Sequence, residues 1–188
     1  MAIPTTFADS METVQVHDKT FVPFITAEQI QARVSELGAL IDREYEGLKP
    51  MLIGVLNGSV IFMADLLRNI HTSCEIGFIR VSSYQGTETT GKVRNLIGLS
   101  ENLEGRHVIL VEDIIDTGDT AVYLIDEIRK KNPASLRFAT MLFKPASLRQ
   151  NITPDYVGFE IPPAFVVGYG LDYDGLGRNL ADIYQLKS

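Results

Sequence analysis

Apolar residues recur at helical spacing near the start of the chain, at Ile30, Val34, Leu37 and Ile41. Just before them, Thr26 and Gln29 have the spacing of a capping box, in which each side chain bonds to the backbone N–H of the other residue. We therefore predict a helix that begins at Thr26 and buries one apolar stripe.

Short continuous apolar runs follow this helix, and helical patterns alternate with them. The runs lie at 51–56, 74–81, 107–111 and 136–143, and the helical patterns lie at 60–67 and 118–128. Strands that are apolar on both faces are typical of parallel sheets covered by helices on either side. We therefore predict an α/β fold with a mostly parallel sheet flanked by helices, and a ligand site at the carboxyl ends of the strands.

One stretch, 82–95, is polar and rich in Gly and Thr. It follows a predicted strand, where a loop could close over a ligand, so we predict a mobile loop there. The chain has 188 residues, of which 45% are hydrophobic, and it contains no repeat or linker-like segment. That length can bury one sizeable core, which favours a single domain over residues 1–188.

The charge balance is acidic, with a formal net charge of −7. A broad basic surface for nucleic acid or for an anionic membrane is therefore not expected. Cys74 is the single cysteine, which excludes an internal disulfide and fits a reducing compartment. The first residues show no basic-then-apolar pattern, and no run of about 20 apolar residues suggests a membrane span. We expect a cytoplasmic protein with no membrane or nucleic-acid partner.

The segment 111–120, with sequence VEDIIDTGDT, joins a predicted strand to a predicted helix. If the strand ends at Val111 and Gly118 opens the helix, the turn presents free backbone N–H groups and two threonine hydroxyls to an anion. Glu112 and Asp113 can accept hydrogen bonds from sugar hydroxyls or hold Mg²⁺ through water. The alternative is that these acids only cap the helix and interact with its dipole. For the whole run, a sugar-phosphate site is the better interpretation.

The order of apolar and acidic residues in this segment resembles the phosphoribosyl diphosphate motif of phosphoribosyltransferases. Further segments resemble the hypoxanthine-guanine branch of that family, in the same order along the chain, at 56–59, 83–84, 144–145 and 165–173. The resemblance implies the type I phosphoribosyltransferase fold, with a small hood formed by roughly the first 25 and last 30 residues. It also implies a homodimer or homotetramer.

The resemblance further implies a reaction. The 5-phosphoribosyl group of phosphoribosyl diphosphate would be transferred to N9 of a 6-oxopurine base, hypoxanthine and also guanine, with release of pyrophosphate. Asp116 would accept the base proton near N7, and a loop carrying Ser83 and Tyr84 would close to exclude water. Mg²⁺ would be the cofactor, held with the help of Glu112, Asp113 and Asp172.

The same resemblance assigns binding residues. Lys144 would donate to O6 of the base, Phe165 would stack on it, and the backbone of Val166 would bond to its edge. Arg178 would reach the pyrophosphate. The complete set of substrate-binding residues is Leu56, Asn57, Gly58, Glu112, Asp113, Ile115, Asp116, Thr117, Gly118, Asp119, Thr120, Lys144, Phe165, Val166 and Arg178.

Two residues depart from the pattern of the family. Asn57 stands where many relatives have Lys or Arg, and Asp119 stands where some have Lys, beside the expected 5′-phosphate. The resemblance also implies a cis peptide bond between Leu56 and Asn57, which turns a backbone N–H toward pyrophosphate.

Other functions remain open at this point. A regulator that senses phosphoribosyl diphosphate without catalysis is one alternative, although it would need a basic face for nucleic acid. A phosphoribosyltransferase for xanthine or for a pyrimidine is another. The stretch 86–92 is similar to the phosphate loop of nucleoside triphosphatases, but Val93 stands where that loop needs Ser or Thr.

Overall fold

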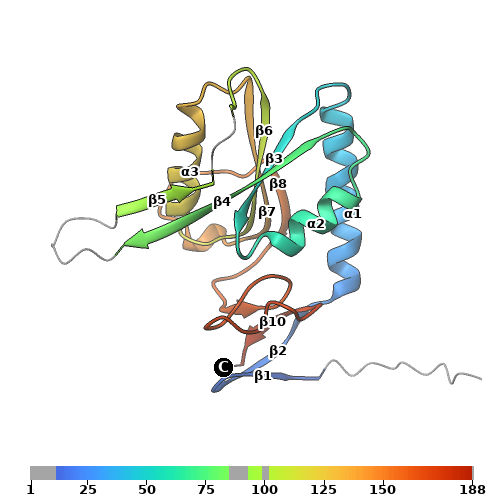
Figure 1. Ribbon diagram of the computed structural model, residues 1–188. Helices are drawn as coiled ribbons and strands as arrows, with labels where there is room; N and C mark the ends of the chain where they lie inside the picture. The colour runs from blue at the N-terminus through green and yellow to red at the C-terminus, as the bar shows by residue number, and fades with distance from the viewer. Residues whose placement is uncertain (1–11, 85–92, 99–101, 188) are drawn as a thin grey trace, which may run out of the picture.

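The computed structural model describes residues 12–84, 93–98 and 102–187 and contains two β-sheets. In Figure 1 the larger sheet lies above the smaller one. The elements, in chain order, are β1 (Val14–Val16), β2 (Lys19–Ile25), α1 (Ala27–Glu44), β3 (Met51–Leu56), α2 (Val60–Arg68), β4 (Glu75–Tyr84), β5 (Val93–Ile97), β6 (His107–Ile115), α3 (Asp119–Arg129), β7 (Ser135–Phe143), a 3₁₀ turn (Pro145–Ser147), β8 (Tyr156–Glu160), β9 (Val166–Val167) and β10 (Ile183–Leu186).

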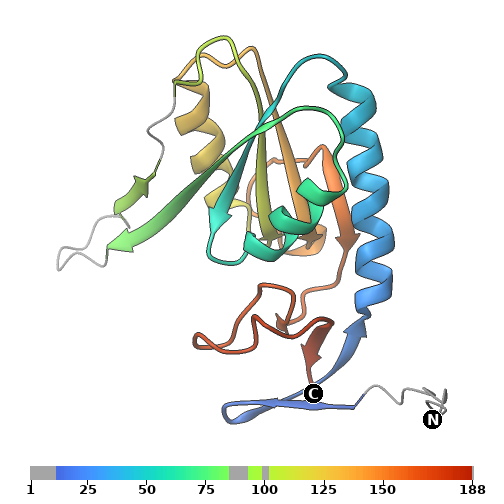
Figure 2. The same ribbon diagram turned by 45° about the vertical axis from the view of Figure 1, so that its right-hand side comes forward.

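The larger sheet has the strand order β5-β4-β3-β6-β7-β8, and all neighbours are parallel except β4 and β5. Helices α1 and α2 cover one face and α3 covers the other (Figure 2). Successive strand residues point to opposite faces, so β3 sends Leu52 into one core and Met51 and Ile53 into the other. The predicted α/β fold is therefore confirmed. Among the described residues, no helix has the length and apolar character needed to cross a membrane.

Helix α1 begins as the sequence predicts. The Thr26 hydroxyl accepts a hydrogen bond from the Gln29 backbone N–H at 3.1 Å, and the Gln29 side chain accepts one from the Thr26 N–H at 2.9 Å. A third bond comes from far along the chain, because the Asp182 carboxylate accepts the Ala27 N–H at 2.6 Å. Residues near both ends of the described chain therefore meet at the N-terminus of α1.

Two strands extend further than the hydrophobic pattern predicted. Strand β4 continues to Tyr84, where it pairs with β5, and β6 continues through the acidic segment to Ile115, which pairs with Phe143 of β7. The prediction that β6 ends at Val111 is therefore wrong, because backbone pairing with β7 continues although the side chains become acidic. Residues 82–84 and 93–95 of the predicted loop lie in strands, and residues 85–92 lie outside the described residues.

The smaller sheet, which we call the hood, is antiparallel with the order β1-β2-β10-β9. Its strands come from residues 14–25 and 166–186, so it joins the two ends of the chain as the resemblance implies. Val16, Phe21, Val167 and Tyr184 form a small core of its own. Other hood residues, including Ile25 and Ile183, belong to the core under α1 and α2. The hood is therefore packed against the larger sheet.

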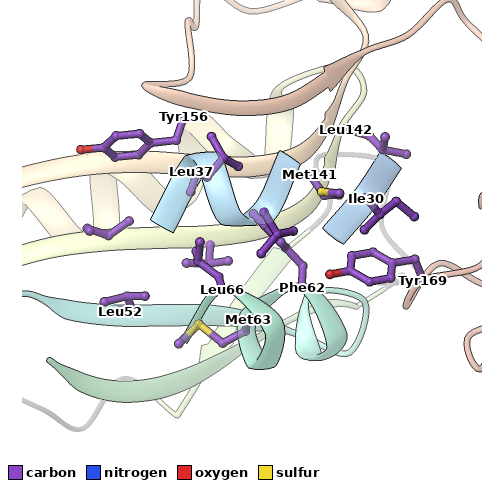
Figure 3. Close-up of a cluster of buried hydrophobic side chains, with 14 of the residues drawn as sticks. Ile30, Leu37, Leu52, Phe62, Met63, Leu66, Met141, Leu142, Tyr156 and Tyr169 are labelled. Atoms are coloured by element: carbon purple, nitrogen blue, oxygen red, sulfur yellow. The ribbon is translucent and has the colours of Figure 1, made fainter. Parts of the chain in front are cut away.

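Tyr169 links the hood to helix α2. Figure 3 shows its ring beside Phe62 and Ile30 in the buried cluster. Its hydroxyl donates a hydrogen bond of 2.8 Å to the Asp65 carboxylate. Burial and this contact with Asp65 raise the pKa of Tyr169, so the phenol keeps its proton.

We expect Tyr169→Phe to lower the free energy of unfolding by about 1.5 to 3 kcal/mol, because a partly buried hydrogen bond to a carboxylate is lost. Urea denaturation followed by circular dichroism measures the change. Tyr173→Phe is the matched control, since its hydroxyl bonds to Asp18 at an exposed position, and it should change stability by about 0.5 kcal/mol or less. Equal losses in the two variants would contradict the role of Tyr169 as a link.

Candidate functional site

The acidic segment lies at the carboxyl end of β6, where the fold predicts a ligand site. A cavity of about 110 Å³ opens there, and its lining residues are Glu112, Ile114, Ile115, Asp116, Thr117, Gly118, Thr120 and Ala121. A larger cavity of about 430 Å³ lies between α3 and β7, but none of the predicted site residues lines it. We therefore place the site at the smaller cavity, where the chemistry of the motif is concentrated.

The turn from β6 into α3 has the geometry of an anion cradle. Gly118 precedes the helix with φ of +84°, a left-handed conformation that favours glycine. A side chain there would also lie 3.1 Å from Ile152 and 3.2 Å from Gln150. The helix that follows begins at Asp119, so its first backbone N–H groups have no partners within the helix. Backbone groups of this kind bind phosphate.

Glu112 and Asp113 are two neighbouring acids with little access to water. Burial, and secondarily the nearby charge of Asp113, raises the pKa of Glu112 well above its usual range. One oxygen of Glu112, Oε2, is buried with no hydrogen-bond partner. Burial also raises the pKa of Asp113, although hydrogen bonds from Glu112 and from the Ile114 backbone oppose the increase. A buried acid with one unpartnered oxygen destabilises a fold, so its presence here favours a binding role.

We expect Glu112→Gln to stabilise the ligand-free protein at neutral pH. The folded state holds the Glu112 proton more tightly than the unfolded chain, so wild-type stability falls as pH rises above the ordinary pKa of 4.5 toward the raised folded value. The amide does not titrate, so the two proteins should differ little at pH 4 and increasingly above it. Thermal melts in EDTA from about pH 4 to pH 8 test this, with about 2 to 4 °C expected per kcal/mol. A constant difference across that range would contradict it.

Asp116 and Lys144 form an ion pair across the ends of two strands. Their Oδ2 and Nζ atoms are 2.7 Å apart. The Lys144 side chain is only 8% exposed, whereas the Asp116 side chain is 49% exposed. The Lys144 backbone N–H bonds to the Ile115 carbonyl at 2.9 Å. The pair thus presents an accessible carboxylate supported by a buried ammonium group.

Three segments distant in sequence meet beside Asp113. A Cβ atom on Gly58 would lie 1.4 Å from Asp113 Oδ2, and a Cβ atom on Gly170 would lie 2.1 Å from the Gly58 carbonyl oxygen. Only glycines allow these approaches. The peptide bond between Leu56 and Asn57 is cis, as the resemblance implies. The loop after β3 is therefore held between the acidic segment and the hood.

Arg178 and Asp172 form a second ion pair, with 2.6 Å between Nη2 and Oδ1. Arg178 also donates to the Gly170 carbonyl at 2.6 Å, and Asp172 accepts the Gly175 backbone N–H at 2.7 Å. The charge of Arg178 acts on Asp113, where it opposes the rise in pKa. These contacts bring the predicted pyrophosphate-binding arginine close to the predicted metal-binding acids.

The acidic residues could hold Mg²⁺ together with substrate phosphates and water. In the part of the chain that the structure describes, no group of three His, Cys, Asp or Glu side chains is placed to hold a metal. Mg²⁺ is, however, commonly held through one or two carboxylates together with substrate phosphates and water. Asp113 and Asp172 could each supply such a carboxylate. The pKa of Asp113 is raised too, but Arg178 opposes that rise, whereas the pKa of Glu112 lies well above its usual range, which disfavours Glu112 as a ligand in the free protein. Mg²⁺ remains a prediction on which the structure is silent.

Phe165 lies 44% exposed at the hood, in an aromatic group. Its ring centroid is 5.7 Å from that of Tyr173 and 6.1 Å from that of Phe21. The Lys19 ammonium lies 4.6 Å from the Tyr173 centroid. Val166 follows Phe165, with its side chain buried and its backbone in β9. An exposed ring that packs against other aromatic rings suits stacking on a flat base.

Two predicted catalytic residues can be placed only by their backbone. Ser83 and Tyr84 end β4, where they pair with Arg94 and Val93 of β5. The structure does not describe their side chains. Their part in closing over the site stays a prediction.

Comparison with known proteins decides the family. The family model described as "Phosphoribosyl transferase domain" matches residues 26–174. This chain belongs to the phosphoribosyltransferase family. Among curated members, the hypoxanthine-guanine phosphoribosyltransferase of Bacillus subtilis (strain 168) is 46% identical over 164 residues, which cover 87% of this chain and 91% of that protein. The bifunctional protein TilS/HprT of Listeria monocytogenes serotype 4b (strain F2365) is 43% identical over 173 residues, 92% of this chain and 27% of that protein.

Solved phosphoribosyltransferase structures share the whole arrangement. A hypoxanthine-guanine phosphoribosyltransferase from Bacillus anthracis, crystallised with a HEPES molecule in the active site, superposes with a TM-score of 0.82 at 43% identity. The match covers 88% of this chain and 98% of that one. A hypoxanthine phosphoribosyltransferase from Staphylococcus aureus gives a TM-score of 0.82 at 41% identity, covering 88% and 90%. The type I phosphoribosyltransferase fold is therefore confirmed, hood included.

Sequence reasoning missed two residues that this phosphoribosyltransferase places beside predicted site residues. Lys19 lies against the aromatic group of the hood, and Gln150 donates to Asp119 at 2.7 Å. Neither residue belongs to a recognisable motif, and no sequence signal could have found them. Their positions depend on the pairing of β2 with β10 and on the path of the chain after β7.

Proposed function

We propose that this chain is a purine salvage enzyme that transfers the 5-phosphoribosyl group of phosphoribosyl diphosphate to N9 of hypoxanthine and guanine, giving IMP and GMP with release of pyrophosphate. The observation that carries the proposal is the Asp116–Lys144 pair at 2.7 Å beside the anion cradle. The pair supplies a proton acceptor and a donor for a 6-oxopurine. The names of the most similar curated relatives support the same substrates.

The pair distinguishes a 6-oxo base from a 6-amino base. A lysine ammonium has three donors and no acceptor, so it can bond to the O6 oxygen but not favourably to an amino group. A site built around such a bond strongly rejects an analogue that lacks it. Asp116, being half exposed, is available to accept the proton that the base loses as the N9 bond forms. Adenine is therefore expected to be a poor substrate.

The remaining site residues act on the sugar donor. The turn at 117–120 would bind the 5′-phosphate, Glu112 and Asp113 the ribose hydroxyls, and the backbone at 56–58 the pyrophosphate. Departure of pyrophosphate leaves positive charge on the ribose, which each of these acids would stabilise electrostatically in its ionised form. Mg²⁺ bound through Asp113, Asp172 and the phosphate oxygens would neutralise part of the leaving-group charge.

Steady-state assays of pyrophosphate release with hypoxanthine, guanine, xanthine, adenine and orotate test the proposal in one experiment. We expect turnover with hypoxanthine and guanine, and adenine at least about 100-fold lower in kcat/KM. Turnover with xanthine alone would favour the xanthine enzyme. Binding of phosphoribosyl diphosphate with no turnover of any base would favour a sensing regulator. Omission of Mg²⁺ in the presence of EDTA should abolish turnover, and full activity without metal would refute the cofactor.

We also propose that the enzyme acts in the cytoplasm as a homodimer or homotetramer. The single cysteine supports a reducing compartment, and burial raises the pKa of its thiol, which makes Cys74 unreactive. The oligomeric state rests on the family alone. Light scattering after size exclusion, compared with the chain mass of 20.9 kDa, measures it directly.

A further inference from the structure

Asp119 places a negative charge beside the cradle that is proposed to bind a phosphate, although it does not line the cavity itself. It is the first residue of α3 and follows Gly118 directly. An acid here helps the helix, because its carboxylate interacts with the positive end of the helix dipole. The same charge repels an incoming phosphate. The site therefore contains a feature that opposes its proposed ligand.

Both oxygens of the Asp119 carboxylate are held by neighbouring side chains. Thr117 Oγ1 donates to Oδ2 at 3.1 Å, and Gln150 Nε2 donates to Oδ1 at 2.7 Å. We call these three residues, Thr117, Asp119 and Gln150, the clasp. Thr117 and Asp119 belong to the phosphate turn, whereas Gln150 belongs to a different segment. Gln150 therefore holds the Asp119 carboxylate from outside the phosphate turn.

The segment that carries Gln150 is fixed against the back of the turn. The Arg149 backbone N–H donates to the Thr117 carbonyl at 2.9 Å. A Cβ atom on Gly118 would lie 3.2 Å from the Gln150 Cβ and 3.3 Å from Leu148 Cδ2. Gln150 thus has a defined position relative to the turn, even though its residue is exposed to solvent.

Binding of a phosphate would change one hydrogen bond of the clasp, the one that Thr117 donates to Asp119. A threonine hydroxyl has a single hydrogen to donate. While Thr117 donates to Asp119, it cannot donate to a phosphate oxygen. When it turns to the phosphate, Gln150 becomes the side chain in the clasp that still holds the Asp119 carboxylate. Gln150 then helps to fix where that charge lies in the bound state.

We propose that Gln150 is a positioning residue, whose side-chain amide holds the Asp119 carboxylate away from the 5′-phosphate of the ribose ligand and thereby sets the affinity for it. The inference rests on the proposed function to the extent that residues 117–120 bind the 5′-phosphate. It adds a residue outside the motif and explains how the turn can carry an acid. Like charges at close range weaken binding by about threefold to a hundredfold, depending on screening.

Titration calorimetry with ribose 5-phosphate, in buffer free of phosphate and sulfate, tests the inference without any purine base. Gln150→Ala should raise Kd about three- to tenfold. Asp119→Asn should lower Kd, because the charge is removed; the amide oxygen can still accept from Gln150, and the amide nitrogen can donate to the Thr117 hydroxyl. In the double variant Gln150→Ala/Asp119→Asn, the effect of the alanine should disappear. The loss in Gln150→Ala should also shrink in about 1 M NaCl, where close charges are screened.

Asn151→Ala is the matched control, because Asn151 is the exposed neighbour of Gln150 and makes no contact with the clasp residues in the hydrogen bonds described. It should leave Kd within about twofold of the wild type. The inference is overturned if Gln150→Ala also matches the wild type, or if its loss persists in the Asp119→Asn background.

The test separates this inference from the proposed reaction. If the wild type does not bind ribose 5-phosphate, the assignment of the cradle to the 5′-phosphate is wrong, and the proposed role of Gln150 is wrong as well. If ribose 5-phosphate binds as expected but no 6-oxopurine is turned over, the proposed reaction fails and the role of Gln150 stands.

Discussion

Asp116→Asn should lower kcat with hypoxanthine by about 10² to 10⁴-fold, the usual value of general-base catalysis. The amide keeps the size of the carboxylate but cannot accept the base proton. In the wild type the buried Lys144 ammonium lies 2.7 Å from the Asp116 carboxylate. The substitution removes this compensating charge. Steady-state kinetics at saturating phosphoribosyl diphosphate measure the loss.

Asp126→Asn provides the control for this variant. Asp126 is an exposed acid on α3 that lies outside the 110 Å³ cavity of the site. It should leave kcat within about twofold of the wild type. If Asp116→Asn retained a kcat close to that of Asp126→Asn, Asp116 would not be the base.

Gly170→Ala should reduce kcat/KM for the purine base by about 100-fold and also destabilise the protein. The new Cβ would lie 2.1 Å from the Gly58 carbonyl oxygen, a backbone atom that cannot move without shifting the loop after β3. Displacement of a site by about 1 Å can reduce the rate 100-fold. The φ of +99° adds about 1 to 2 kcal/mol of strain for any residue with a Cβ. Urea denaturation and steady-state kinetics measure the two effects.

Gly175→Ala separates the strain from the collision. Gly175 has a φ of +84° and lies on the same hood segment, but a Cβ there would meet nothing within 4 Å. It should show the loss of about 1 to 2 kcal/mol in stability and keep most of its kcat/KM. Similar kinetic losses in both variants would show that contact between the hood and the loop is not what matters.

Long periodic elements of this fold were predictable from sequence. Helix α1 begins at its capping box and buries Ile30, Val34, Leu37 and Ile41, as predicted. The hood strands were not found, because they are short and because β2 contains Pro23, which lacks a backbone N–H for the ladder. The structure accommodates this proline where the pairing of β10 with β2 shifts register, next to Tyr184. Pairing between strands that are distant in sequence leaves no periodic pattern of apolar residues along the chain.

The β4–β5 pair shows a second limit. Its outer part extends beyond the body of the larger sheet (Figure 1). A strand that projects in this way needs no alternation of apolar residues, so the polar sequence after Val81 suggested a loop. Composition alone cannot distinguish a projecting two-stranded ribbon from an irregular segment.

The sequence assigns candidate residues to the site but does not predict the contacts between them. Asp116 and Lys144 are 28 positions apart, and the sequence assigned a role to each but did not predict their ion pair. Their proximity follows from the pairing of Ile115 with Phe143, because each charged residue is the next one along its chain. Ending β6 at Val111 concealed that relation. The raised pKa of Glu112 depends on burial, which the order of residues does not give.

The Asp182 carboxylate that caps α1 and the pairing of β10 with β2 have a consequence for biosynthesis. The ribosome makes β1 and β2 before the larger sheet, whereas β9 and β10 follow it. Strand β2 can pair with β1 at once, but its pairing with β10 and the Asp182 bond to the start of α1 wait for the segment from Val166 to Leu186. The aromatic group at Phe165 likewise forms only when the segment that carries Phe165 and Tyr173 has followed the larger sheet. In the proposed enzyme, the turn assigned to the ribose phosphate is therefore synthesised before the aromatic ring assigned to stack on the purine.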